Sequence, residues 1–323
     1  MKHFSDRLGL SAVLLLFLAL LLHPSAALEG ARRGLRVCGE SVVPSLLPFL
    51  TLSGLLNGLG LAKALAGRLS RWTARLFAAP GCAAGPFLLG LTGGYPVGAA
   101  ALAALVREGA LDPEEAGRLL PVCNNTGPAF LVGAAGLGVF GSGRIGALLY
   151  LSHVLSAIGT GLLLSIGKPR TAPSSAPAPI PSRSLGILLP EAVKSAVRAA
   201  LNITGFVVFF SVLTALLEQT GLLTAWAGAL SLRLGLELRA ARALLIGLLE
   251  LGGGVAALGG VSPTPVNLAI CSFVLGFGSL SVHGQTLAVL EGTGIKKTSR
   301  HMTGRLLHAA LSAAITYVVT RLL

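Results

Sequence analysis

The sequence has few charged side chains. Asp, Glu, Lys and Arg together make up 11% of its 323 residues, whereas a soluble globular protein carries about 25%. Hydrophobic residues make up 53% and the mean hydropathy is +0.80, so too few polar groups are present to cover a water-soluble domain. Several apolar stretches approach the ~20 residues that a helix needs to cross a bilayer. The composition therefore predicts an all-α protein with several membrane-spanning helices.

Aromatic residues are scarce as well, at 5%, and no platform for stacking bases is visible. The net charge is +13, but the basic residues stand singly or in small groups between apolar spans. That distribution is typical of the charged flanks of membrane helices. We therefore expect no nucleic-acid partner, and the lipid bilayer is the first expected partner.

Motifs for catalysis and metal binding are absent. The sequence has no HExxH, GxSxG or GxxxxGK[ST] motif and no pair of acidic residues inside one span, so an enzyme is not expected. The cysteines are far apart and form no CxxC pair, which gives no indication of a disulfide framework or a zinc site. They are Cys38, Cys82, Cys123 and Cys271.

The N-terminus permits two interpretations. Lys2 and Arg7 precede the apolar run 10–22, and small residues follow it, which fits a cleaved signal peptide. The same run fits a first membrane helix followed by arginines. We expect a retained helix, in an N-terminal unit of residues 1–35, because the rest of the chain inserts in any case.

A segment rich in Pro, Ala and Ser, residues 168–190, divides the remaining chain. Such a composition favours a solvated, semi-extended linker. It separates a first membrane unit, residues 36–167, from a second, residues 191–323. Apolar spans are predicted at 10–28, 42–66, 72–90, 94–107, 126–140, 145–166, 193–217, 221–235, 241–260, 264–281 and 303–322.

The two membrane units share ordered features. Gly90 and Gly247 lie in similar apolar contexts, and Gly127 and Gly284 are separated by the same number of positions. Ordered matches at one offset indicate an internal duplication. Repeats of this kind are a common plan of secondary transporters, which bind their substrates near the membrane midplane at broken helices.

The first unit is interrupted at Gly93, Gly94, Tyr95 and Pro96. Pro96 lacks an amide donor, and glycines accept dihedral angles that other residues avoid. Backbone groups freed in hydrocarbon find partners only inside protein or beside a water-filled cavity. The break is therefore either an unwound segment that lines a site or a simple packing kink.

A second interruption places polar side chains before a Gly-Pro pair. Asn124, Asn125 and Thr126 precede Gly127, and amides can both donate and accept hydrogen bonds. They suit a polar, uncharged ligand such as a sugar or the edge of a base. The alternative is a helix cap in an ordinary loop.

The second unit supplies matching pieces. Glu250 lies within an apolar run, and a carboxylate at the centre of a membrane helix costs about 2.5–3.5 kcal/mol on insertion scales. We expect it to face a cavity and hold a cation or a proton, unless it extends to the interface. Polar side chains also surround a predicted glycine break in this unit, at Ser281, His283 and Gln285. They either bind a ligand or form hydrogen bonds between packed helices.

Several strings resemble one known family over most of the chain from about residue 36, except the linker. They are Thr-Gly-Gly-Tyr-Pro-Val-Gly-Ala (92–99), Cys-Asn-Asn-Thr-Gly-Pro-Ala-Phe (123–130), Leu-Ser-His (151–153), Gly-Leu-Leu-Glu-Leu (247–251), a string ending in Leu-Ser-Val-His-Gly-Gln (276–285) and Arg-Leu-Leu-His (305–308). These strings look like the YlbJ family of sporulation integral membrane proteins, with nucleoside-recognition (Gate) domains. Gly93 stands where that family often has Ser.

The resemblance implies a multi-pass protein of the bacterial cell membrane with a role in spore cortex formation. It also implies a transporter-like or solute-binding activity, because Gate domains are similar in part to concentrative nucleoside transporters. We expect a small polar solute as ligand, no organic cofactor, and Na⁺ or H⁺ as the coupling ion of any transport. The alternative is a non-transporting assembly or scaffold protein whose partners are a second copy or other sporulation membrane proteins.

Overall fold

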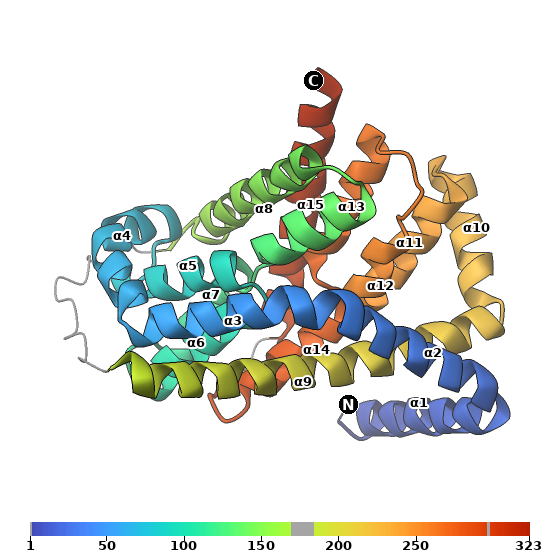
Figure 1. The fold of residues 1–323 in the computed structure, drawn as a ribbon, viewed down its shortest axis with the longest axis horizontal. Coiled ribbons are helices and arrows are strands. Elements are labelled where there is room, and N and C mark those ends of the chain that lie inside the picture. Colours follow the sequence, from blue (N-terminus) through green and yellow to red (C-terminus); the bar gives the residue numbers. More distant parts are fainter. Residues whose placement is uncertain (1, 169–183, 296–297) are drawn as a thin grey trace.

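The computed structural model describes residues 2–168, 184–295 and 298–323, and every regular element within them is a helix (Figure 1). The all-α prediction is confirmed. The elements are α1 (Lys2–Leu22), α2 (Pro24–Val37), η1 (Cys38–Val42), α3 (Val43–Gly58), α4 (Leu61–Phe77), η2 (Gly81–Ala83), α5 (Ala84–Gly93), α6 (Val97–Arg107), α7 (Pro113–Cys123), η3 (Ala129–Val139), α8 (Gly143–Leu164), α9 (Leu185–Gln219), α10 (Leu222–Leu234), α11 (Leu238–Leu249), α12 (Leu251–Ala256), α13 (Pro265–Phe277), α14 (Ser279–Leu290) and α15 (Thr298–Leu322).

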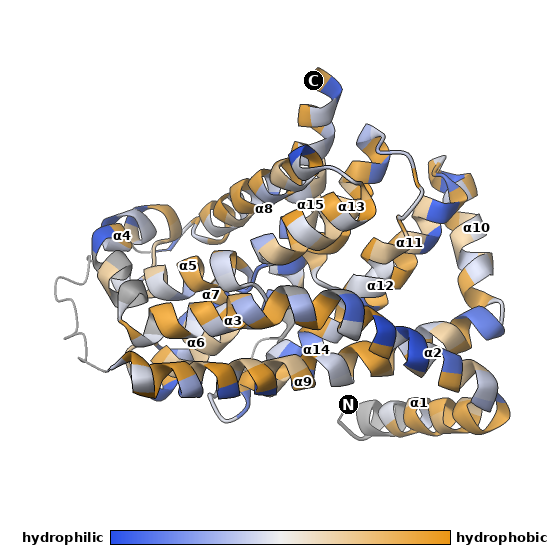
Figure 2. Cartoon of the chain, viewed as in Figure 1, coloured by the Kyte–Doolittle hydropathy of each residue, from blue (hydrophilic) through white to orange (hydrophobic). Residues whose placement is uncertain are grey.

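Within the described part of the chain, four helical stretches are long and apolar enough to cross a membrane, or up to six if two bent pairs count as spans. Hydrophobic residues dominate the described part of α1 and long stretches of α9 (Figure 2). The protein is therefore an all-α, multi-pass membrane protein. The four stretches are Gly143–Leu164, Leu185–Gln219, Pro265–Leu290 and Arg300–Leu322.

One continuous helical run, formed by α2, η1 and α3, packs antiparallel along α9 (Figure 1). Small residues permit the close approach. A Cβ added at Gly30 would lie 2.8 Å from the Val212 Cα, and one added at Gly58 would lie 2.7 Å from the Leu188 side chain. The predicted boundary between residues 35 and 36 falls inside this run.

Two helix pairs fold back on themselves as hairpins. In a straight helix, residues seven or eight positions apart are separated by more than 10 Å. Instead, a Cβ added at Gly98 would lie 2.9 Å from the Gly90 Cα, and one added at Gly254 would lie 2.1 Å from the Gly247 Cα. We name α5 with α6 hairpin 1, and α11 with α12 hairpin 2.

Hairpin 2 corrects the prediction of one span over residues 241–260, because α11 ends at Leu249 and the chain turns at Glu250. The predicted span over 72–90 is not one straight helix but one of the two bent pairs. Helix α4 ends at Phe77, Ala78 takes a left-handed conformation with φ of 44°, and Pro80 follows. The chain then bends by 102° before α5.

Two further helices are interrupted without folding back. The break between α7 and η3 covers residues 124–128, and the break between α13 and α14 is Gly278. The break that the sequence analysis placed at Gly284 is wrong, because this glycine lies inside α14. Gly278 has a φ of 86°, and a Cβ there would lie 2.6 Å from the Tyr95 hydroxyl oxygen. Each unit thus contains a long helical run, a short helix, a hairpin, a broken helix and a final helix. The internal duplication stays a prediction.

The predicted linker, residues 168–190, lies largely on residues 169–183, which are outside the described residues. Its C-terminal end is wrong, because α9 already begins at Leu185. The early start has a packing reason, since Leu188 is buried against Gly58 at the end of α3.

Hairpin 1 encloses the end of α7, which leads to a prediction about stability. A Cβ added at Gly98 would lie only 1.8 Å from the Cys123 carbonyl oxygen. We expect Gly98→Ala to lower the free energy of unfolding by about 3 kcal/mol or more, because rigid backbone has to move. Gly205→Ala on α9, where nothing lies within 4 Å, is the matched control and should not destabilise the protein. Thermal unfolding in detergent measures both, and equal midpoints would contradict the hairpin geometry.

Candidate functional site

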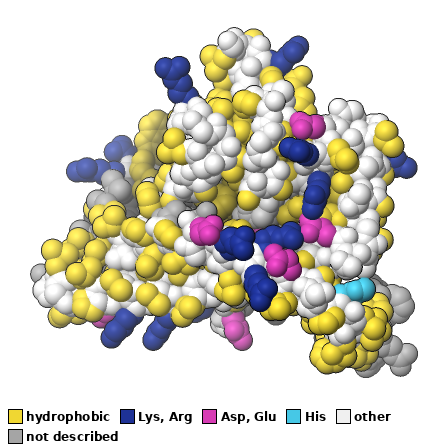
Figure 3. Space-filling model, turned by 45° about the vertical axis from the view of Figure 1, so that its right-hand side comes forward, with side chains coloured by type: hydrophobic (Ala, Val, Ile, Leu, Met, Phe, Trp, Pro, Cys, Tyr) yellow, Lys and Arg dark blue, Asp and Glu magenta, His cyan; other side chains and the backbone are white. Residues whose placement is uncertain are grey.

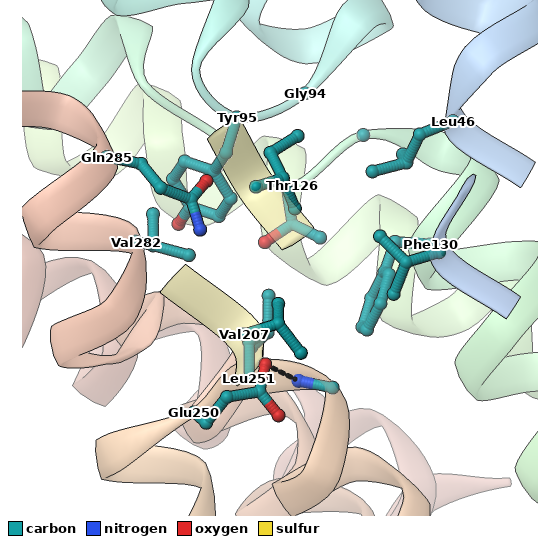
Figure 4. Close-up of a pocket in the computed structure, with 14 residues that line it drawn as sticks. Leu46, Gly94, Tyr95, Thr126, Phe130, Val207, Glu250, Leu251, Val282 and Gln285 are labelled. Carbon is teal, nitrogen blue, oxygen red and sulfur yellow. Dashed lines mark hydrogen bonds between the residues drawn. The ribbon is translucent and has the colours of Figure 1, made fainter. Parts of the chain in front are cut away.

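The tips of both hairpins, the first helix break and α14 meet at one cavity of about 50 Å³ (Figure 4). Tyr95, Thr126 and Gln285 lie at one end of it, and Glu250 lies at the other. The walls between them are mostly apolar. The lining residues are Val42, Leu46, Gly94, Tyr95, Thr126, Gly127, Phe130, Ile203, Val207, Glu250, Leu251, Gly252, Val282 and Gln285.

The structure brings together half of the residues that the sequence analysis proposed for the site. Gly94, Tyr95, Thr126, Gly127, Glu250 and Gln285 line the cavity. Gly93 and Pro96 are buried beside the tip of hairpin 1. Ser281 lies behind the lining, where its hydroxyl accepts a hydrogen bond of 3.4 Å from the Gln285 Nε2.

Asn124 and Asn125 are fully buried but do not line the cavity. The Asn124 Nδ2 donates to the Thr286 Oγ1 at 2.8 Å, which ties the first break to α14. The Asn125 Nδ2 donates to the Val122 carbonyl oxygen at 2.7 Å. The two amides therefore hold the shape of the break, as capping groups do, instead of facing the cavity.

His283 also lies away from the cavity. Its ring packs against Phe277 and His301, with ring centroids 5.3 Å and 4.9 Å away. His153, which the sequence analysis treated as a packing or network residue, has a definite partner. Its Nε2 accepts a hydrogen bond of 3.1 Å from the Thr126 backbone amide, and its ring lies 4.3 Å from that of His308. This histidine therefore positions a residue that lines the cavity.

Glu250 is 3% exposed and sits between the two helices of hairpin 2. Its carboxylate accepts hydrogen bonds from the backbone amides of Gly252, at 2.8 Å, and Gly253. Negative charge at the first turn of a helix is favourable because the unpaired amides point toward it. The hairpin itself therefore compensates part of the cost of burying this carboxylate.

A second cavity, of about 380 Å³, reaches Glu250 from the opposite direction. We name it the charged vestibule, since Arg33, Arg239, Arg242 and Glu218 line it. Glu218 pairs with Arg33 at 3.0 Å and also with Arg242. Figure 3 shows basic and acidic side chains gathered side by side across one face of the molecule. Glu250 thus lines both the central cavity and the charged vestibule.

Arg305 is the central residue that the sequence analysis did not identify as part of the site. It is 1% exposed. Its guanidinium donates to the carbonyl oxygens of Asn124, at 2.8 Å, and Phe277, at 3.2 Å. It also donates to the carbonyl oxygens of Pro121 and Gly276 and to the Tyr95 hydroxyl.

No carboxylate among the described residues pairs with Arg305. Its charge is instead compensated by carbonyl groups at the C-terminal ends of α7 and α13, where the helix dipole is negative. An arginine suits this place because its planar fork presents five donors in fixed directions. The signal available in the sequence was a basic residue just inside the last apolar span, which resembles an ordinary flanking residue.

Fold and site together define a multi-pass α-helical membrane protein with two helical hairpins and two broken helices around a central cavity. A relative, the sporulation integral membrane protein YlbJ of Bacillus subtilis (strain 168), is 33% identical over 301 residues, covering 85% of this chain and 73% of the relative. The chain belongs to the YlbJ family. No family model and no solved structure matches it.

The bonds of Arg305 lead to a second prediction. In Arg305→Lys, the lysine ammonium group keeps the charge but cannot reach the ends of both broken helices. We therefore expect the free energy of unfolding to fall by about 3 kcal/mol. Arg321→Lys, at the exposed end of the same helix, should change it by less than about 0.5 kcal/mol. Thermal unfolding of both purified variants measures the difference. A wild-type midpoint for Arg305→Lys would show that the guanidinium does not hold the breaks together.

Proposed function

We propose that the protein serves spore formation by binding a small polar solute in the central cavity and moving it across the membrane. The observation that carries the proposal is the convergence of two hairpin tips, one helix break and α14 on one cavity with a carboxylate. Broken helices around a midplane site are typical of secondary transporters. The name of the Bacillus subtilis relative supports the link to sporulation, and cortex formation is the step that we propose.

A displacement of hairpin 2 would give the solute a route into and out of the central cavity. The charged vestibule lies on one side of α12, and a third cavity of about 600 Å³ lies on another. Helix α12 has only six residues, and three of them are glycines. A short segment with open space beside it can move at a low cost in packing, because few contacts are lost. Its displacement would connect the central cavity with the vestibule.

The chemistry of the lining indicates the class of solute. Phe130, Val207 and Val282 provide apolar walls, while Gln285 and Glu250 provide an amide and a carboxylate. Such a cavity suits a molecule with an apolar face and with hydrogen-bond donors directed toward Glu250. A nucleoside has both features, and because ligand pockets usually measure about 300–1,000 Å³, the cavity of about 50 Å³ would have to open toward the vestibule to hold one. Na⁺ or H⁺ at Glu250 is the proposed coupling ion, because it would neutralise the carboxylate during transport.

A non-transporting assembly protein is the alternative, and one observation favours it. Asn124, Asn125 and His283 are engaged with neighbouring residues and do not face the cavity. In that case the breaks would serve to build a rigid surface for partner proteins. Substitutions inside the cavity would then leave sporulation unchanged.

A binding screen tests the proposed site. We expect a nucleoside or a related small polar solute to raise the unfolding temperature of the purified protein, because a ligand that binds only the folded state stabilises it. Gln285→Leu and Glu250→Gln should abolish the increase. Glu108→Gln, in an exposed turn after α6, is the matched control and should retain it. An increase that survives both cavity variants would place the ligand elsewhere.

Sporulation separates the two candidate functions. In a spore-forming host that lacks its own family member, the wild-type chain and Glu108→Gln should restore heat-resistant spores. We expect Gln285→Leu to reduce their number at least tenfold with normal membrane levels of the protein, because the cavity is blocked. Full restoration by Gln285→Leu would favour the assembly role.

A further inference from the structure

Helix α4 carries two opposite faces of different character. Arg68, Arg71, Trp72 and Arg75 are spaced i, i+3, i+4 and i+7, so they share one face, and all four are exposed. We name these residues the Arg-Trp face. On the other side, Ser70, Thr73, Ala74 and Phe77 follow the same spacing and are buried in the protein.

Neither water nor hydrocarbon suits the Arg-Trp face. Trp72 is 61% exposed, which leaves a large apolar ring uncovered in water. Three guanidinium groups in the hydrocarbon core would each cost several kcal/mol. The headgroup layer of a bilayer accepts both, since indole rings concentrate there and arginines reach phosphates. The direction of α4 agrees, because the chain bends by 102° between α4 and α5, as expected where a helix on the membrane surface leads into one that enters the membrane.

The charge of α4 identifies the kind of lipid. The helix contains basic residues but no acidic ones, and Arg68, Arg71 and Arg75 form no ion pair within the described part of the chain. Anionic headgroups are the complementary partner, because each basic side chain near such a surface is attracted to it. Zwitterionic headgroups supply no net opposite charge.

Helix α10 provides an internal comparison. It holds the other of the two tryptophans in the chain, Trp226, which is 52% exposed. Its sequence contains a single basic residue, Arg233. The two helices therefore share an exposed indole ring but differ in charge.

We propose that the Arg-Trp face of α4 is a docking surface for anionic phospholipid headgroups, which hold α4 in the plane of the membrane surface. The proposal rests on the outward direction of three unpaired arginines and a tryptophan. It is independent of any solute in the central cavity.

Single-tryptophan variants of the full chain test the proposal. Trp226→Phe leaves Trp72 as the reporter, and Trp72→Phe leaves Trp226 as the matched control. Each variant is reconstituted in phosphatidylcholine vesicles with a trace of either brominated phosphatidylglycerol or brominated phosphatidylcholine. Brominated lipids quench tryptophan emission on contact, so the ratio of the two signals measures lipid preference.

We expect brominated phosphatidylglycerol to quench Trp72 about fivefold more effectively, since one basic side chain at an anionic surface contributes roughly that factor. High salt should reduce the preference through screening. Trp226 should show a ratio near one, and so should Trp72 after Arg68→Gln, Arg71→Gln and Arg75→Gln are combined. Equal quenching of Trp72 by both lipids in the variant with intact arginines would overturn the proposal, whether or not the triple variant folds.

Discussion

The contacts of Arg305 hold the centre of the molecule together. A buried guanidinium needs several acceptors, and a carboxylate partner would bring its own cost of desolvation. Here the acceptors are carbonyl groups at the ends of two broken helices, together with the tyrosine at the tip of hairpin 1. Each helix break frees carbonyl groups that need donors. The arginine and the breaks therefore satisfy each other, and neither is favourable in a membrane alone.

Close packing of small residues places the hairpins around this centre. Gly90 and Gly98 let α5 and α6 approach each other around the Cys123 carbonyl group, while Gly247 and Gly254 do the same for hairpin 2. In lipid, such approach is stabilised by van der Waals contact between backbones, since burial of apolar surface provides little driving force. The cavity is the space that remains where the two tips, the first break and α14 meet.

Much of the site could be read from the sequence. The breaks at Gly93–Pro96 and at Asn124–Gly127 stand out because hydrophobicity is interrupted there by residues that membrane helices otherwise avoid, and Glu250 stands out as a carboxylate in an apolar run. The contacts of individual side chains could not be predicted from the sequence in the same way. Asn124 and Asn125 have the chemistry of ligand-binding amides, yet Thr286 and the Val122 carbonyl group occupy their donors. Polarity predicts that a residue has a partner, but it does not say whether that partner is a ligand or the protein.

The sequence by itself determined the membrane class, the helical fold and the positions of the two breaks in the first unit, because each depends on local composition and on local backbone preference. Only the tertiary structure decided which apolar runs fold back, where Arg305 lies and which polar groups share the cavity. The physical reason is that these features depend on contacts between segments far apart in the chain. Glu250 illustrates the difference: its cost in a membrane was evident from its residue type, whereas its position between the central cavity and the charged vestibule required the packing of both units.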